Sequence, residues 1–335
     1  MNQTTQLKEV PIFFACDDAY IPYFAVALES LEANATKNYQ YMIRVMYANN
    51  GISAANQAKI KQRYHHDNFN IEFVDITDVI KKHNDKFFTR DYYSNATYYR
   101  LFIPNMYPQY DKVLYLDSDI VILDDIANLY NTDLGDNLVG AATDESVQLV
   151  PDLCEYVVNR VKVETPKHYF NAGILLMNLR RLREIDFENT FLNLIGSVTF
   201  DIAQDQDYLN VICHGQVKYI DDAWDKMPFD NPNGVKEEDL KLVHYNHDRK
   251  PWLNDDVLYQ DYFWQYARQS NFYDDVYQRK AASTDKQRQV AAEQFVNLLA
   301  KAKEEAINVV ENRSITQIIN EICAFDLTDT GAVCA

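Results

Sequence analysis

The order of apolar and amphipathic segments constrains the fold of this chain most. Short apolar runs alternate with helix-like spacing over the first 76 residues, at 10–15, 23–31, 43–48, 57–64 and 71–76. Alternating strands and helices predict a parallel sheet whose crossover connections are helices. Sheets of this kind bind ligands at the carboxyl ends of their strands. Asp17 and Asp18, which follow the first run, are therefore expected at a ligand-binding edge.

Two carboxylates interrupt a later apolar run. Residues 112–116 predict a strand that leads into Asp117, Ser118 and Asp119, and apolar residues resume at 120–123. Such a local conflict with burial is typical of a functional site. Two acids at this spacing can both reach a divalent cation, and Mg²⁺ and Mn²⁺ also bind diphosphate oxygens. A solvated turn is the alternative for the acids, and Ser118 either points away or contacts a nucleotide.

His244 is the candidate for a third metal ligand. Imidazole suits Mn²⁺ better than Mg²⁺, so two carboxylates with one histidine favour manganese. Lys250 follows six residues later, where its ammonium group could contact a phosphate. The alternatives are a structural histidine and a surface lysine.

Four further polar residues stand at the ends of predicted elements. Asp205 and Gln206 begin a predicted helix, where they either cap it or face a reacting sugar. Asp144 and Asn171 lie at strand edges, where they either bind sugar hydroxyls or shape turns.

Charge and composition exclude some classes of protein. The formal net charge of −18 argues against a nucleic-acid partner, because phosphate backbones are bound by an excess of Lys and Arg. A single nucleotide needs only local cations, which a bound metal can supply.

The five cysteines lack metal-binding spacing, so reduced thiols and a cytoplasmic location are expected. No apolar run reaches the ~18 residues that span a membrane, and a signal core is absent.

Six motifs follow one another in a fixed order: ACDDAY at 15–20, ATYYRL at 96–101, VLYLDSD at 113–119, FNAG at 170–173, DQD at 205–207 and HY…KPW at 244–252. This series resembles glycosyltransferase family 8, which includes bacterial lipopolysaccharide galactosyl- and glucosyltransferases and glycogenin. The resemblance covers about residues 10–255. It implies a GT-A fold, with a Rossmann-like, mainly parallel central sheet flanked by helices. It also implies a UDP-sugar donor, Mn²⁺ with Mg²⁺ as the alternative, and retention of anomeric configuration.

The resemblance also implies roles for individual residues. Asp117, Asp119 and His244 match the metal ligands. The positions that match nucleotide-sugar contacts are Asp17, Asp18, Tyr20, Arg100, Ser118, Asp144, Asn171 and Lys250. Asp205 matches a position that holds the donor sugar, and Gln206 matches the residue beneath the anomeric carbon; these two are the candidate catalytic residues. Because an amide is a weak nucleophile, same-face attack is preferred to a double displacement, although Asp205 is chemically a better nucleophile than Gln206.

The implied reaction is transfer of glucose or galactose from UDP-glucose or UDP-galactose to a glycan, lipopolysaccharide-type or glycoprotein acceptor. Two alternatives remain: a self-glucosylating, glycogenin-like protein, and a UDP-sugar-binding protein without turnover. Peripheral contact with the inner face of a membrane and homo-oligomerisation are left open.

Two positions depart from the family pattern. His247 stands where the family usually has a glycine, so it either changes the loop locally or adds a second imidazole near the diphosphate. Ala19 stands where a polar side chain often follows the paired acids, which leaves one nucleotide contact without its usual residue.

The character of the chain changes near residue 269, which predicts a catalytic domain at 1–268 and a helical extension at 269–335. Residues 290–309 have helical periodicity, and Ser314 is expected to cap a second helix. That helix carries Ile315, Ile318, Ile319 and Ile322 on one face. Because the charges of this segment are mixed, we expect a helical pair that covers the catalytic domain rather than a membrane contact.

Overall fold

The computed structural model describes residues 7–83, 95–324 and 327. The strands are β1 (Lys8–Ala15), β2 (Tyr39–Tyr47), β3 (Phe69–Asp75), β4 (Lys112–Leu116), β5 (Ile120–Ile122), β6 (Val139–Ala141), β7 (Ile174–Asn178), β8 (Val217–Tyr219) and β9 (Leu242–His244). The first ten helices are α1 (Ile21–Asn34), α2 (Ala54–Arg63), α3 (Thr77–Lys81), α4 (Ile103–Met106), α5 (Ile126–Tyr130), α6 (Glu145–Leu149), α7 (Pro151–Asn159), α8 (Leu179–Glu184), α9 (Phe187–Ile195) and α10 (Asp205–Ile212). In the described part of the chain these are followed by α11 (Gln260–Ala267), α12 (Tyr273–Ala282), α13 (Asp285–Ile307) and α14 (Val309–Cys323).

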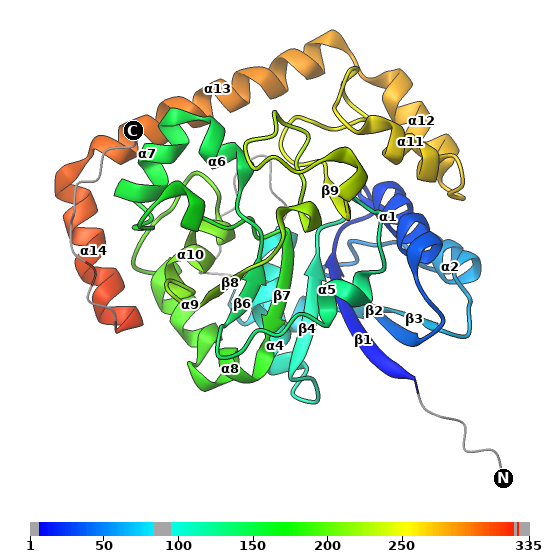
Figure 1. The fold of residues 1–335 in the computed structure, drawn as a ribbon, viewed down its shortest axis with the longest axis horizontal. Helices are drawn as coiled ribbons and strands as arrows, with labels where there is room; N and C mark the ends of the chain where they lie inside the picture. The colour runs from blue at the N-terminus through cyan, green and yellow to red at the C-terminus, as the bar shows by residue number, and fades with distance from the viewer. Residues whose placement is uncertain (1–6, 84–94, 325–326, 328–335) are drawn as a thin grey trace.

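Seven strands form the central sheet, in the order β3-β2-β1-β4-β7-β6-β8 (Figure 1). β1, β2, β3 and β4 are parallel to one another, whereas β7 runs antiparallel to both of its neighbours. The predicted mainly parallel sheet is thus confirmed. Because β1 and β4 are parallel, the residues after Ala15 and after Leu116 emerge at the same edge of the sheet.

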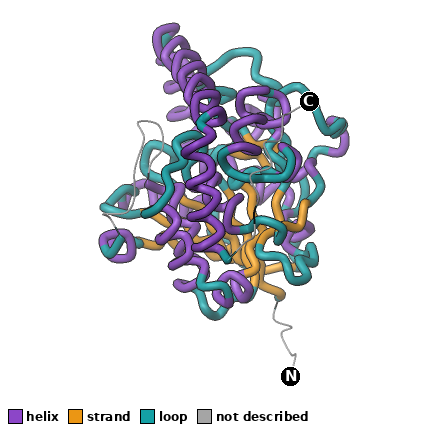
Figure 2. The backbone as a smooth tube through the Cα atoms, turned by 90° about the vertical axis from the view of Figure 1, so that its left-hand side faces the viewer, coloured by secondary structure: helices purple, strands orange, loops and turns teal. Residues whose placement is uncertain are grey.

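Helices cover both faces of this sheet, and the strands lie between them (Figure 2). In β1, Ile12 and Phe14 pack into the core on the side of α1, while Phe13 packs into the core on the other side. This alternation follows from the two-residue period of a strand. Residues 10–15 thus read as one continuous apolar run because the strand is buried on both faces.

The C-terminal helices pack on the rest of the molecule. In Figure 1, α13 runs across the top of the molecule from α12 to α7, and α14 then descends beside α9. Ala302, Ala306, Ile315 and Ile319 join the core cluster that lies on that side of the sheet. The expected helical extension is present, and the boundary at residue 268 stays a prediction.

The start of α14 differs from the prediction. Asn308 caps this helix by accepting a hydrogen bond from the Glu311 amide, and Ser314 lies inside the helix. The earlier start follows from Asn312, whose buried side-chain amide donates to the carbonyls of Glu305 and Ala306 at the end of α13.

Two expectations from composition can be compared with the described part of the chain. Cys16, Cys213 and Cys323 are free, but Cys154 takes part in a disulfide, so the expectation of reduced cysteines is wrong for Cys154. Within residues 7–83 and 95–324, no helix combines the length and the apolar character needed to cross a membrane.

Candidate active site

Asp117 and Asp119 lie where the chain leaves the central sheet. β4 ends at Leu116, and the chain then turns to form β5, which pairs antiparallel with β9 in a separate two-stranded sheet. Ile120 is the register partner of His244 in that sheet. The change of sheet explains why two acids interrupt an apolar run, and it brings them beside the histidine. One ligand atom from each of Asp117, Asp119 and His244 lies within 4.8 Å of the other two.

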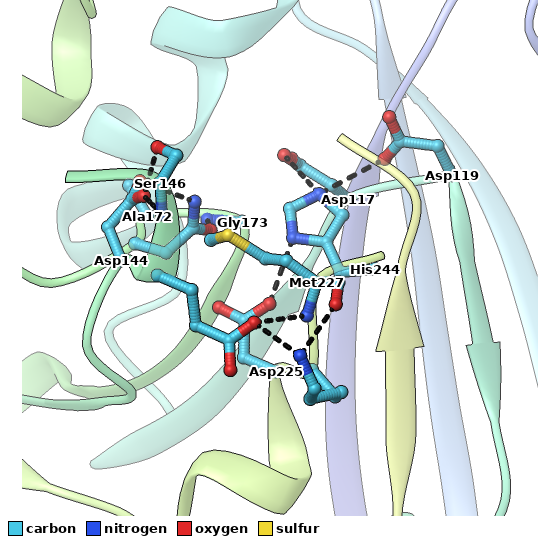
Figure 3. A network of polar contacts seen from close by, with 12 residues as sticks. Asp117, Asp119, Asp144, Ser146, Ala172, Gly173, Asp225, Met227 and His244 are labelled. Atoms are coloured by element: carbon cyan, nitrogen blue, oxygen red, sulfur yellow. Dashed lines mark hydrogen bonds and ion pairs between the residues drawn. The ribbon is translucent and has the colours of Figure 1, made fainter. Parts of the chain in front are cut away.

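The His244 ring is held between carboxylates on both of its nitrogen atoms (Figure 3). Its Nδ1 lies 2.9 Å from Oδ1 of Asp225, while its Nε2 lies 3.4 Å from Asp119 and 3.9 Å from Asp117. The Asp225 side chain is fully buried. A carboxylate behind a histidine fixes the orientation of the ring and makes it a better metal ligand. Asp225 therefore directs Nε2 toward the two acids.

Burial and neighbouring charges shift the pKa values of the residues at this site in opposite directions. Burial disfavours the imidazolium form of His244, but Asp225 and Asp119 outweigh it and raise its pKa to about 10. Burial raises the pKa of Asp117, with Arg100 acting in the opposite direction. For Asp119, burial is outweighed by Lys250 and His244, which together lower its pKa. The protein thus gathers several carboxylates around one imidazolium, a charge pattern that a divalent cation would also balance.

Gly173 allows the ligands to approach closely. Its carbonyl accepts a hydrogen bond from the Asp117 amide at 2.8 Å. A Cβ atom at this position would lie 2.8 Å from Oδ2 of Asp117 and still closer to Cε1 of His244. The glycine of the FNAG motif is therefore required by space and not by backbone conformation.

Arg100 links the metal-ligand candidates to the start of α10. Its side chain is almost fully buried and forms ion pairs with Asp205 at 3.0 Å and Asp117 at 3.5 Å. It also donates to the carbonyl of Ala172. Burial raises the pKa of Asp205 to about 7, although Arg100 acts in the opposite direction. Asp205 and Gln206 are not the cap of α10, because Gln204 occupies that position with φ of 47°.

Gln206 belongs to a second hydrogen-bonded cluster. Its Nε2 donates to Asp144 at 2.9 Å, and its Oε1 accepts from the Ala172 amide at 2.9 Å. Asn171 also donates to Asp144, at 3.1 Å. Both ends of the Gln206 amide are thus fixed. The structure brings these three sequence-predicted residues together.

The remaining predicted nucleotide contacts lie after β1. Oδ1 of Asp17 accepts from the Tyr20 amide at 3.0 Å, whereas Asp18 accepts from Ser53 and Asn56 at the start of α2. The Ser118 hydroxyl lies 3.5 Å from the Ala15 carbonyl, so it faces the end of β1. The nucleotide contact of Ser118 stays a prediction.

The loop after β9 returns to the acids. The Lys250 ammonium group pairs with Asp119, and the Lys250 side chain is largely buried, so it is not a surface lysine. His247 has φ of 50°, in the left-handed region that favours glycine. The histidine thus adopts a glycine-like conformation itself.

Sequence and structure comparisons agree on one family. Residues 11–256 match the glycosyl transferase family 8. The chain belongs to this family. The galactosyltransferase LgtC, solved with donor and acceptor sugar analogues, is 30% identical with a TM-score of 0.64, and the match covers 78% of this chain and 96% of LgtC. The bifunctional glycosyltransferase WbbM is 25% identical with a TM-score of 0.67, and the match covers 84% of this chain and 53% of WbbM.

General stress protein A of Bacillus subtilis is 24% identical over 274 residues, which cover 76% of this chain and 92% of that protein. The family resemblance and the GT-A fold predicted from the sequence are therefore confirmed, and the chain is a family 8 glycosyltransferase in fold and sequence.

A buried ion pair that no motif in the sequence indicates supports this family 8 site. Lys226 and Glu145 pair at 2.7 Å, with side chains 0% and 1% exposed. Glu145 follows Asp144, while the Lys226 amide donates to Leu242 and its carbonyl accepts from His244. The pair therefore connects the segment of Asp144 to the strand that carries His244. Neither residue has a local signal, because acids and lysines are common in this chain.

Proposed function

We propose that this family 8 protein is a retaining, Mn²⁺-dependent glycosyltransferase that transfers glucose or galactose from a UDP-sugar to a saccharide or glycoconjugate acceptor. The observation that supports the proposal is the group Asp117, Asp119 and His244, with His244 oriented by a buried carboxylate. LgtC supports the choice of a hexose donor, because it is a galactosyltransferase of similar fold.

The residues fit a divalent cation. Two carboxylates and one imidazole are ligands that Mn²⁺ accepts, whereas Mg²⁺ prefers oxygen atoms alone. Gly173 keeps the space beside two of these ligands free of a side chain. When bound, the cation would stabilise the negative charge that develops on the diphosphate as the sugar departs.

The side chains around the proposed metal site can share this work. Lys250 lies beside Asp119 and places a positive charge where a diphosphate would bind. Arg100 places a second positive charge between Asp117 and Asp205. Fixed charges of this kind stabilise a leaving group without reorganising during the reaction. The network of Asp144, Asn171 and Gln206 offers acceptors and donors for sugar hydroxyls.

Retention of configuration fits attack on the same face as the leaving group. Gln206 is a weak nucleophile, and both ends of its amide are already hydrogen-bonded. Asp205 is paired with Arg100, which holds its carboxylate in place. We therefore assign Gln206 to stabilising positive charge at the anomeric carbon. Accumulation of a sugar adduct on Asp205 or Gln206 with a slow acceptor would overturn this assignment.

The direct test is UDP release from a panel of UDP-sugars, with and without Mn²⁺. We expect release with UDP-glucose or UDP-galactose, lost in Asp117→Ala and in Asp119→Ala. Asp136→Ala is the matched control, because Asp136 is an exposed acid in a loop. Survival of full activity in both site variants would refute the metal assignment.

The same samples separate the two alternatives. Intact mass after incubation should stay unchanged, and a mass increase by hexose units would instead support self-glucosylation on one of the 24 tyrosines. Tight binding of UDP without its release from any UDP-sugar would support a binding protein without turnover.

A further inference from the structure

His247 combines three features that a residue serving only to shape the loop does not need. Its backbone has φ of 50°, where glycine would fit more easily. Its ring packs against two aromatic rings. Its Nε2 is buried and has no hydrogen-bond partner among the described residues. The positive φ and the buried nitrogen without a partner are both unfavourable in the free protein. Together they indicate a function for the imidazole.

Two phenylalanines fix the position of the ring. The centroid of the His247 ring lies 6.1 Å from that of Phe229 and 6.1 Å from that of Phe295. Phe229 lies in the segment between β8 and β9, and Phe295 lies on α13. Packing against two aromatic neighbours restricts the positions that the ring can take. The C-terminal helix α13 thereby contacts the loop that carries Lys250.

His247 lies three residues from His244 and three from Lys250, in the loop that returns to the proposed donor site. Burial lowers the pKa of His247, and the charges that act on its ring come from Asp144, Lys250, Asp248 and His244. Asp144 belongs to the cluster assigned to the sugar, and Lys250 to the charge assigned to the diphosphate. The position in this loop and these charges together put His247 in the surroundings of the proposed donor site.

We propose that the His247 imidazole hydrogen-bonds through Nε2 to an oxygen of the donor's diphosphate, as a second polar contact beside Lys250. This inference rests on the proposed function, because it requires a nucleotide donor at this site. A phosphate oxygen would satisfy the buried nitrogen that has no partner in the free protein. The aromatic contact with Phe295 gives α13 a positioning role, since it holds the ring toward the ligand.

The sharpest variant is His247→Phe, which keeps an aromatic ring beside Phe229 and Phe295 but removes both nitrogen atoms. Calorimetry with Mn²⁺ present should show UDP and UDP-glucose binding about 10-fold more weakly or worse, the loss expected for a hydrogen bond to a charged group. Binding of Mn²⁺ without nucleotide should be unchanged, because His247 is not among the proposed metal ligands. His247→Gly, which fits φ of 50°, should show the same loss and guards against misfolding of the first variant.

The outcomes separate this inference from the proposed function. Absence of Mn²⁺-dependent UDP binding in the natural sequence would refute the proposed function itself. Full UDP affinity in both His247 variants would refute only the hydrogen bond. A loss that affects UDP-glucose but spares UDP would also refute it, because the contact would then be to the sugar.

Phe295→Ala tests the positioning role of α13. We expect it to weaken UDP binding several-fold, while Val296→Ala, at a neighbouring position that is 63% exposed, should leave UDP binding unchanged. Equal UDP affinities in the two variants would refute positioning of the ring by α13.

Discussion

Replacing Gly173 by alanine tests the geometry of the proposed metal site without removing a ligand. The new Cβ would lie 2.8 Å from Oδ2 of Asp117 and closer still to Cε1 of His244, whereas ordinary contact begins at 3.4 Å. The Asp117 carboxylate must therefore move by about 0.6 Å and the His244 ring by more. Metal–ligand distances tolerate only about 0.2 Å of error. We expect the Mn²⁺ affinity of Gly173→Ala to fall by about 10-fold to 100-fold.

The assay is calorimetric titration of Mn²⁺, with thermal unfolding of the metal-free protein measured in parallel. Overpacking alone should destabilise the fold by about 1–3 kcal/mol. Gly140→Ala is the matched control, because its Cβ would lie 2.8 Å from Cδ2 of Leu134, away from the proposed site. Both variants should lose stability, but only Gly173→Ala should lose metal affinity. Mn²⁺ binding by Gly173→Ala with the affinity of the natural sequence would refute the reasoning.

Three further perturbations test the surroundings of the site. Asp225→Asn removes the charge behind His244, so the Mn²⁺ affinity should fall about 10-fold or more by calorimetry, and the pKa of His244 in the metal-free protein should drop below about 10 by proton NMR. Burial raises the pKa of Glu145 from 4.5 to about 7, although Lys226 acts in the opposite direction. The contribution of Glu145 to stability is therefore greatest below about pH 4.5 and is lost as the pH rises through about 7. In urea unfolding across this range, the free energy of unfolding should depend less on pH in Glu145→Gln than in the natural sequence. The loss of the carboxylate partner of Lys226 can lower that free energy at every pH without changing this expectation. Arg160→Ala removes a buried side chain that pairs with Glu311 at 2.8 Å and donates to Thr199, so urea unfolding should show a loss of about 2 kcal/mol, while Lys303→Ala should change stability by less than about 0.5 kcal/mol.

Two of the proposed metal ligands, Asp117 and Asp119, could be predicted because they form a recognisable local pattern in the sequence. Acids within an apolar run conflict with burial, and the structure shows the cause, since the chain changes sheets at Asp117. His244 has no such local pattern around it, and the order of the motifs indicates it instead. Its proximity to the acids depends on the pairing of β5 with β9, two strands of three residues each, which are too short for periodicity to reveal.

The orientation of His244 could not be predicted, because Asp225 stands among similar acids. Asp221 and Asp222 precede it in the same short segment. Asp221 caps a turn by accepting from the Ala223 amide, whereas Asp225 is buried behind the histidine ring. Only the path of the chain between β8 and β9 distinguishes these roles. The start of α14 could not be predicted for a similar reason, because the Asn312 side chain bonds to the end of α13 and the helix already begins at Val309, before Ser314.

Local charge, rather than net charge, decides whether this acidic chain can hold an anionic ligand. The net charge is −18, yet Arg100, Lys226 and Lys250 have side chains at most 9% exposed, and each pairs with a carboxylate at or beside the proposed site. Buried cations of this kind are screened little by solvent, whereas surface acids more than about 10 Å away are screened strongly at ordinary ionic strength. The acidic surface therefore opposes a long nucleic-acid chain, whereas a metal ion at the proposed site, together with these buried cations, would supply the local positive charge that one diphosphate needs. The proposed nucleotide donor is thus compatible with an acidic protein.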